Sequence, residues 1–344
     1  MFWFLRILPL FLLMGCSHDK VRWETVTLPT IHEPVTLRVV YAENPRFSKL
    51  SADDLKTMLQ YTKKACEKHL AVEVDFELMP MIPIEKLFDD YLKPGVRKAR
   101  ENEIYDFRHR SGDRSRLVDA MRKGLAERHT PLKELISYAA PHLLRQPKAE
   151  TEEAFAESLA DTLLNRIGLW QAMPASDGSP VLDDSFYNEW IYWDSLGYAA
   201  PPFDIVITNT LIASVEYFGQ DIHSALRGGL TVGTTTNSRS ELGAYVFWST
   251  FAFTEAYPLL KQLRDKDYKA DNALLLSGTY LAHEIGHLLF HYGHTFETDA
   301  CIMTPVPMLY FKQWYNGLDK KRCDAGRFPG MQKGAAKLYY RPDW

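Results

Sequence analysis

The chain has 344 residues, of which 46% are apolar and 24% are charged, and its formal net charge at pH 7 is −4. This is the composition of a folded protein with a sizeable core, and it excludes an extended disordered chain. The slightly acidic balance, without a run of Lys or Arg, argues against a nucleic acid or an anionic membrane surface as the partner.

The N-terminal segment differs from the rest of the chain. One cation, Arg6, precedes an apolar run from Ile7 to Met14 that is too short to span a bilayer. The pattern predicts a signal peptide over residues 1–15. Its end, Leu-Met-Gly-Cys, resembles a bacterial lipobox, which implies that Cys16 carries a lipid. With Ser17 next, the resemblance implies a protein anchored to the cell envelope, at the outer membrane and facing the periplasm, through a lipid that does not span the bilayer.

A β-α-β pattern follows the expected linker, residues 16–34. Residues 35–42 are mostly apolar and predict a strand. A helix over residues 51–70 begins with a serine, a favourable N-cap residue. Alternating apolar positions in residues 71–80 predict a half-buried strand. We expect residues 35–82 to form the N-terminal part of the main domain.

Residues 83–172 change in character. They are rich in Lys, Arg, Glu, Leu and Ala, and their apolar residues recur with helical periodicity. This pattern predicts an insertion of about four helices, whose many charges form solvated faces.

Residues 173–344 return to a β-rich pattern that ends in a long helix. The aromatic stretch 186–198 predicts a loop packed onto the domain, or alternatively a platform that stacks a substrate such as a sugar. Residues 203–214 predict a buried strand, 228–236 a Gly- and Thr-rich edge strand, and 244–253 a third strand.

The segment "HEIGHLLFHYGH" lies at the end of an apolar helix. Residues i and i+4 of a helix lie one above the other, so His283 and His287 can bind one ion. Glu284 then lies beside the ion, where it can accept a proton from a bound water. Zinc is the expected ion, because neutral imidazoles and an open fourth position suit it. The alternative is a hydrogen-bonded core cluster without metal.

The third ligand is expected after the helix. His291 would lie about 12 Å along the helix from the first histidine, which is beyond the reach of one zinc ion. Gly293 can adopt the left-handed conformation that ends a helix, so His294 can turn back to the ion. Glu297 and Asp299 remain alternative third ligands.

The histidine segment resembles the metzincin metallopeptidases, whose motif is H-E-x-x-H-x-x-G-x-x-H followed by a Met-turn. His283, Glu284 and His287 match in place, whereas Phe290 stands at the glycine position. The turn glycine and the third histidine appear later, as Gly293 and His294, so the third ligand comes one residue late.

The segment after the histidines extends this resemblance. The triplet Cys301-Ile302-Met303 resembles the C-x-M of archaemetzincins and puts Met303 at the place of the Met-turn methionine. The family's additional C-x-x-C is absent, so its second zinc site is not expected. Pro305 stands where some metzincins carry a tyrosine, and Tyr310 is a candidate substitute.

The resemblance implies an α+β, metzincin-like zincin domain with a mixed, twisted sheet and an active-site helix, here carrying the helical insertion. It implies one zinc ion per chain, held by His283, His287 and His294, with Glu284 as the general base of a peptidase acting on periplasmic proteins or peptides. Two alternatives remain: a lipid-anchored binding module with a non-catalytic zinc site, and a zinc amidase acting on cell-wall peptides.

Export would place the cysteines in an oxidising compartment. Cys301 and Cys323 bracket the segment after the histidines, and a bridge between them would contribute about 3 kcal/mol to stability. Cys66 lies in a helical pattern and is expected to be a buried thiol.

Overall fold

The computed structural model describes residues 34–107, 112–126, 130–197, 199, 201–217, 222–236, 245–290, 294 and 300–319, and the backbone of strands β1 (Trp23–Thr27) and β10 (Ala335–Tyr339). β1 and β10 pair antiparallel, which joins the two ends of the chain. The signal peptide and Cys16 lie outside the described residues, so the lipid anchor stays a prediction.

A mixed sheet forms the centre of the protein. Its strands lie in the order β3-β2-β5-β9-β8, and β4 pairs with the end of β2. β2, β3, β5 and β9 run parallel, whereas β8 is antiparallel to β9 and forms one edge. This sheet, together with the helices around it, confirms the α+β class. The strands are β2 (Val35–Glu43), β3 (Val74–Leu78), β4 (Ile82–Pro83), β5 (Ile205–Thr208), β8 (Gly233–Thr236) and β9 (Tyr245–Ser249).

Helices cover both faces of the sheet. Side chains alternate along a strand, so Val39 and Tyr41 of β2 face the larger core, which contains α1 (Ala52–Ala65) and α11 (Ala273–Phe290). Val40 and Ala42 face the smaller core, against α2 (Ile84–Tyr91) and α7 (Trp190–Gly197). Burial on both faces explains why the central strands are continuously apolar rather than alternating.

The predicted helix at residues 51–70 is α1 with a π-helical turn at its end, η1 (Cys66–Leu70). Ser51 and Asp54 form a reciprocal capping box at its start. α1 packs directly on α11, and a Cβ built on Gly278 would lie only 2.2 Å from the carbonyl oxygen of Met58. The backbones of the two helices therefore lie in direct contact at Gly278.

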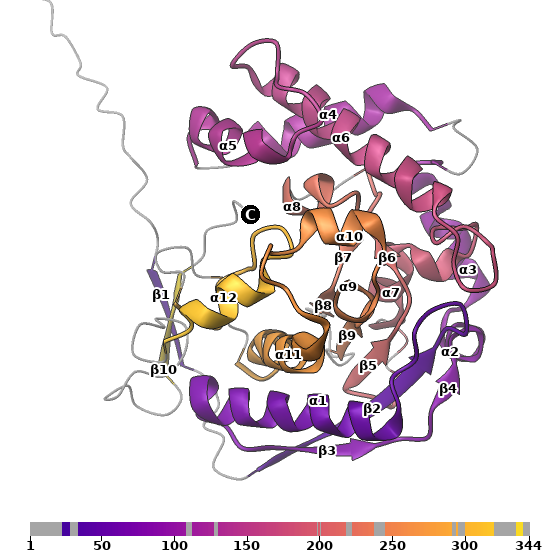
Figure 1. The fold of residues 1–344 in the computed structure, drawn as a ribbon, viewed down its shortest axis with the longest axis vertical. Helices are drawn as coiled ribbons and strands as arrows, with labels where there is room; N and C mark the ends of the chain where they lie inside the picture. The colour runs from indigo at the N-terminus through magenta and orange to yellow at the C-terminus, as the bar shows by residue number, and fades with distance from the viewer. Residues whose placement is uncertain are drawn as a thin grey trace, which may run out of the picture.

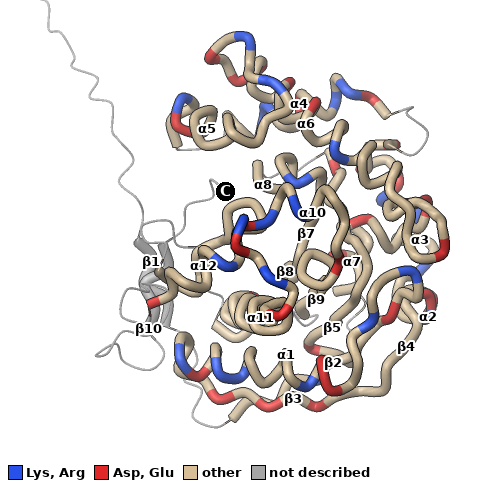
Figure 2. Tube along the Cα trace, in the orientation of Figure 1, with Lys and Arg blue, Asp and Glu red and all other residues tan. Residues whose placement is uncertain are grey.

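The segment between β4 and β5 is helical, as predicted. After α2 it contains α3 (Pro94–Arg100), α4 (Arg114–Ala126), α5 (Leu132–Ala139) and α6 (Glu152–Ala172). α4, α5 and α6 lie together on the side of the molecule opposite α1 and β3 (Figure 1). Charges of both signs are scattered along these helices (Figure 2), as expected for solvated faces.

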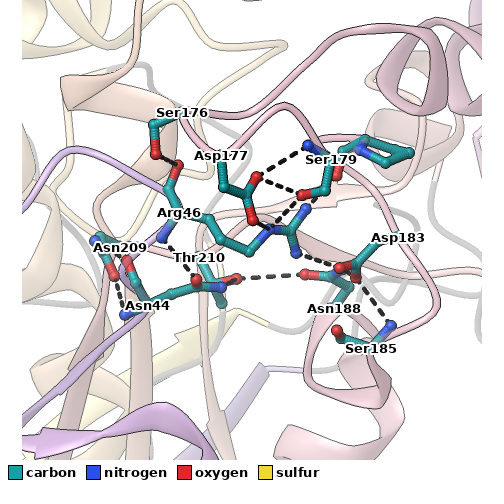
Figure 3. A network of polar contacts seen from close by, with 11 residues as sticks. Asn44, Arg46, Ser176, Asp177, Ser179, Asp183, Ser185, Asn188, Asn209 and Thr210 are labelled. Atoms are coloured by element: carbon teal, nitrogen blue, oxygen red, sulfur yellow. Dashed lines mark hydrogen bonds and ion pairs between the residues drawn. The ribbon is translucent and has the colours of Figure 1, made fainter.

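A buried polar network holds the connection between α6 and α7 (Figure 3). The Arg46 side chain pairs with Asp183 and donates a hydrogen bond to the carbonyl oxygen of Pro180. Asn209, just after β5, donates to the carbonyl oxygen of Asn44, just after β2, at 2.9 Å. The pairing satisfies the buried charge of Arg46, which would otherwise be costly to remove from water. The network also ties this connection to the carboxyl ends of two central strands.

Two predicted strands are shorter than expected. The strand predicted at residues 203–214 splits into β5 and β6 (Ile212–Ala213), because Thr208 accepts a side-chain hydrogen bond from the backbone of Thr210 and turns the chain. The strand predicted at 244–253 ends at Ser249, whose hydroxyl accepts from the amide of Phe251. Beyond that point the chain forms the short helix α9 (Phe251–Thr254).

The aromatic stretch forms a 3-10 turn and α7 rather than the loop that its composition predicted. Tyr192 and Trp193 are 3% and 0% exposed, which supports its interpretation as packing material. No described helix is both long and apolar enough to cross a membrane. The other described elements are η2 (Glu101–Glu103), η3 (Ala140–His142), η4 (Phe186–Asn188), α8 (Ile222–Leu226), β7 (Leu230–Thr231), α10 (Pro258–Leu263), η5 (Ala270–Asn272) and α12 (Phe311–Gly317).

The contact between α1 and α11 can be tested at Gly278. Replacing Gly278 with alanine should lower the free energy of unfolding by about 2 kcal/mol or more, because the new methyl group meets backbone rather than a flexible side chain. Gly168 in α6 is the matched control, since nothing lies within 4 Å of a Cβ there. Gly168→Ala should raise stability by about 0.5–1 kcal/mol. Equal effects of the two substitutions in denaturant unfolding would contradict the close packing.

Candidate metal centre

α11 positions the first two candidate ligands. Most side chains of this helix are apolar, and it is therefore buried against α1 and the sheet. His283, on this buried helix, is only 1% exposed. One turn later, His287 points the same way, and the two Nε2 atoms lie 3.0 Å apart. Two zinc-bound nitrogens in a tetrahedral site would lie about 3.3 Å apart. The spacing of the two rings therefore fits a shared ion.

His294 completes the group. Its ring centroid lies 5.1 Å from that of His283 and 4.9 Å from that of His287, which are themselves 4.6 Å apart. One ligand nitrogen from each ring lies within 4.8 Å of the others. These three histidines together could hold a metal ion. Gly293, the expected site of the bend, lies outside the described residues.

His283 is prepared for metal binding by a backbone hydrogen bond. Its Nδ1–H donates to the carbonyl oxygen of Ile302 at 2.8 Å, which leaves the lone pair of Nε2 directed toward His287. Burial, together with the nearby rings of His287 and His294, holds the pKa of His283 well below its usual value of 6.5. The ring is therefore neutral, as a ligand must be, and its second nitrogen is oriented.

The segment that carries Ile302 lies against α11. It turns tightly, with the amide of Thr304 donating to the carbonyl oxygen of Cys301 at 3.0 Å. Met303 is fully buried, and its sulfur would lie 2.5 Å from a Cβ built on Gly286. A larger residue at position 286 would therefore require the Met303 side chain to move away from the helix. Cys301 is disulfide-bonded, whereas Cys66 is a free, buried thiol as predicted. Cys323 lies outside the described residues, so its pairing stays a prediction.

Glu284 lies beside the histidines on α11 and is 6% exposed. The hydroxyl of Thr235, in the edge strand β8, lies 2.9 Å from its Oε2 and from its backbone oxygen. Burial raises the pKa of Glu284, and the nearby His287 and the bond from Thr235 only partly offset this. The carboxyl group thus has a fixed position and an increased affinity for a proton.

The candidate metal centre opens into a cavity of about 260 Å³. Sequence reasoning missed most of its far wall, because Glu216, His223 and Arg227 belong to no motif and meet the histidines only in the fold. The predicted edge strand was the one signal for part of this wall. The lining residues are Trp190, Ser214, Glu216, His223, Ser224, Arg227, Leu230, Thr231, Val232, Gly233, Thr234, Tyr280, His283, Glu284, His294, Pro305 and Val306.

The remaining sequence-predicted residues fall in different places. Pro305 lines the cavity, but Tyr310 is not among the lining residues and instead packs its ring on His142 at 6.0 Å. The suggestion that Tyr310 substitutes for a metzincin tyrosine thus has no support from its position. His291, Glu297 and Asp299 lie outside the described residues. Comparison with known proteins adds no assignment, since no family model, curated protein or solved structure matches the chain.

The role of the third histidine can be tested by metal analysis. His294→Ala should lower zinc affinity by more than about 100-fold, because loss of a ligand should exceed the 10- to 100-fold effect typical of outer partners. His291→Ala is the matched control, since a helix continued to residue 291 would place that histidine too far from His283, and the variant should keep one zinc per chain after dialysis. Full zinc content in His294→Ala would instead point to Glu297 or Asp299.

Glu216 gives a prediction on pH. Burial raises the pKa of its carboxyl group from 4.5 to about 7. A raised pKa means that folding favours the protonated form, so this stabilising contribution is lost as pH rises from about 4.5 through 7. Glu216→Gln cannot ionise. Its stability relative to wild type should therefore increase by about 3 kcal/mol between about pH 4 and pH 8, as measured by denaturant unfolding with chelator present. A pH-independent difference would contradict the raised pKa.

Proposed function

We propose that the protein is a zinc-dependent peptidase that hydrolyses peptide bonds of proteins or peptides. The observation that carries this proposal is the convergence of three histidine rings beside the buried carboxyl group of Glu284, at the wall of a cavity. Zinc held by His283, His287 and His294 would supply Lewis acidity, polarising the scissile carbonyl group and making a water molecule more acidic.

Glu284 would carry the proton. In this proposal its carboxylate accepts a proton from the attacking water and later delivers it to the leaving amine. Its raised pKa suits both steps near neutral pH, because a base with too low a pKa transfers protons poorly. The hydroxyl of Thr235 would hold one carboxylate oxygen in place and leave the other for the water.

The edge strand β8 would hold an extended substrate. Among the described residues it pairs only with β9, and Gly233 and Thr234 also line the cavity. A peptide added along this edge would gain backbone hydrogen bonds and would pass in front of Glu284. Thr235 would then connect the substrate-binding strand to the general base.

The metzincin resemblance remains part of the proposal. It is supported by Met303, which packs against α11 at Gly286, near the histidines, as expected of the Met-turn methionine of that family. The late third histidine and the proline at residue 305 are departures from the family pattern.

We also propose that the protein is lipid-anchored through Cys16 in the bacterial cell envelope, facing the periplasm. The disulfide at Cys301 supports export, because disulfides persist in oxidising compartments. A purely structural zinc site is the less favoured function, because such a site usually has four protein ligands and needs neither a cavity nor a general base.

The function can be tested at Glu284. Glu284→Gln should keep one zinc ion per chain, because the ligands are unchanged, but should lower the rate of peptide hydrolysis by at least about 100-fold. A digest of a mixed peptide library, read by mass spectrometry, measures the activity. Glu134→Gln, which removes an exposed glutamate of α5, is the control and should cleave like wild type. Normal hydrolysis by zinc-loaded Glu284→Gln would overturn the proposed role.

A further inference from the structure

A second cavity lies along the connection from α9 to α11. Its volume is about 350 Å³, and the described residues that line it belong to the segment from Phe253 to Ala270. No described residue lines both this cavity and the one at the histidines. Charges of both signs follow one another along this connection (Figure 2). The second cavity is therefore a separate place to look for a ligand.

Arg264 is the buried cation of this cavity. It is only 7% exposed, whereas Lys261 and Lys266, which also line the cavity, are exposed. Its Nε donates to the carbonyl oxygen of Ala252 in α9 at 2.8 Å, which holds the guanidinium in place. An arginine is rarely buried to this extent unless an acid pairs with it.

The guanidinium of Arg264 has no such acid. Its Nη2 is buried without a hydrogen-bond partner, and neither Nη1 nor Nη2 bonds to any residue that the structure describes. Its Cζ lies over the ring of Tyr268, 4.4 Å from the centroid, and this contact stabilises the charge but offers no oxygen to the N–H groups. Burial lowers the pKa of Arg264, and Tyr268 and Glu255 only partly offset this.

The two acids of the cavity are directed to backbone amides instead. Both carboxylate oxygens of Asp265 accept from amides of α12, at 2.9 and 3.0 Å. The Oε1 of Glu255 accepts from the amide of Ser48 at 2.5 Å. Within the described part of the chain, neither acid forms an ion pair with Arg264. The protein thus keeps a buried cation next to a cavity without placing a carboxylate on it.

The charges and the size of the cavity indicate the class of ligand. Three cations and two acids line it, which gives a formal net charge of +1. A carboxylate carries one negative charge and matches the planar fork of a guanidinium. A phosphate group carries about −1.5 to −2 charges, and the two acids would repel it more strongly. The volume of about 350 Å³ lies in the lower part of the roughly 300–1,000 Å³ range of small-molecule pockets. It leaves room for an organic group beside the carboxylate.

We propose that this cavity is a second ligand site, which binds a small organic carboxylate through the guanidinium of Arg264. The carboxylate supplies the acceptors that the described residues do not, and it neutralises the net charge of the cavity. The inference does not rest on the proposed peptidase function, because the residues of the two cavities are separate.

Binding of small probes to the full chain tests the inference. The probes are 3-phenylpropanoate, 3-phenylpropanamide and inorganic phosphate, each titrated by protein-observed NMR. An aromatic acid is chosen because Phe253 and Tyr268 are among the lining residues. The carboxylate should bind about 10- to 100-fold more tightly than the amide, which has the same shape but no charge. Equal affinities, or no binding of the carboxylate, would overturn the inference. Tighter binding of phosphate would overturn the proposed ligand class.

Substitution of Arg264 provides the second arm. Arg264→Gln should reduce the preference for the carboxylate to less than about 3-fold, because glutamine can donate hydrogen bonds but carries no charge. Arg264→Lys keeps the charge without the planar fork, and should weaken carboxylate binding by about 3- to 10-fold. Arg145→Gln is the matched control, because Arg145 is 67% exposed and lies outside this cavity, and it should bind like wild type.

Thermal melts show which of these variants are folded. If Arg264→Gln does not fold, Arg264→Lys decides the outcome. A carboxylate held by a metal ion at the histidines would keep its full affinity in both variants. Unchanged carboxylate binding in a folded Arg264 variant would therefore overturn the inference.

The place of binding separates this inference from the proposed function. The carboxylate should shift the NMR signals of residues 253–270, and shifts confined to the residues around the histidines would overturn the inference. Glu284→Gln should bind the carboxylate like wild type even though its peptide hydrolysis is expected to be lost. Either proposal can thus fail while the other stands.

Discussion

The hydrogen bond from His283 to the carbonyl oxygen of Ile302 joins two segments on which the candidate metal centre depends. It connects the buried helix α11 to the tight turn at residues 301–304 and selects the neutral tautomer whose free nitrogen faces His287. Met303 packs in the same turn against Gly286, so one side of the helix is held by a hydrogen bond and by close packing together. A ligand with both nitrogens oriented loses little freedom on binding an ion, which is why such outer contacts matter for metal affinity.

The same helix sets the position of Glu284, the proposed general base, and carries one wall of the cavity. α11 packs against the backbone of α1 at Gly278, where a side chain would meet the carbonyl oxygen of Met58. Another face of α11 lies against the edge strand β8, where Thr235 bonds to Glu284. Burial then raises the pKa of the carboxyl group and lowers that of His283, and both changes follow from the removal of water from ionisable groups. The helical segment contributes to the cavity indirectly, because α5 and α6 pack against the cavity wall around α8.

Much of the secondary structure and the central motif could be predicted from local pattern. The capping serine at residue 51 and the apolar periodicity placed α1 and α11, and the spacing of His283 and His287 placed them on one face of a helix. The strands at 203–214 and 244–253 were predicted too long, since side-chain hydrogen bonds at Thr208 and Ser249 turn the chain where hydrophobicity continues. The aromatic stretch was expected to be a loop, because high aromatic content does not distinguish a buried helix from a packed connection.

The sequence by itself determined the α+β class, the pairing of two histidines and a glutamate within one helical turn, and the position of His294 as a candidate third ligand. These features depend on contacts within a few residues, which periodicity and helix geometry describe. Only the tertiary structure decided that Ile302 orients His283, that Thr235 holds Glu284, and that Arg227 and Glu216 share a cavity with them. These groups are far apart along the chain, so their proximity depends on how the helices pack on the sheet, and no local pattern carries that information.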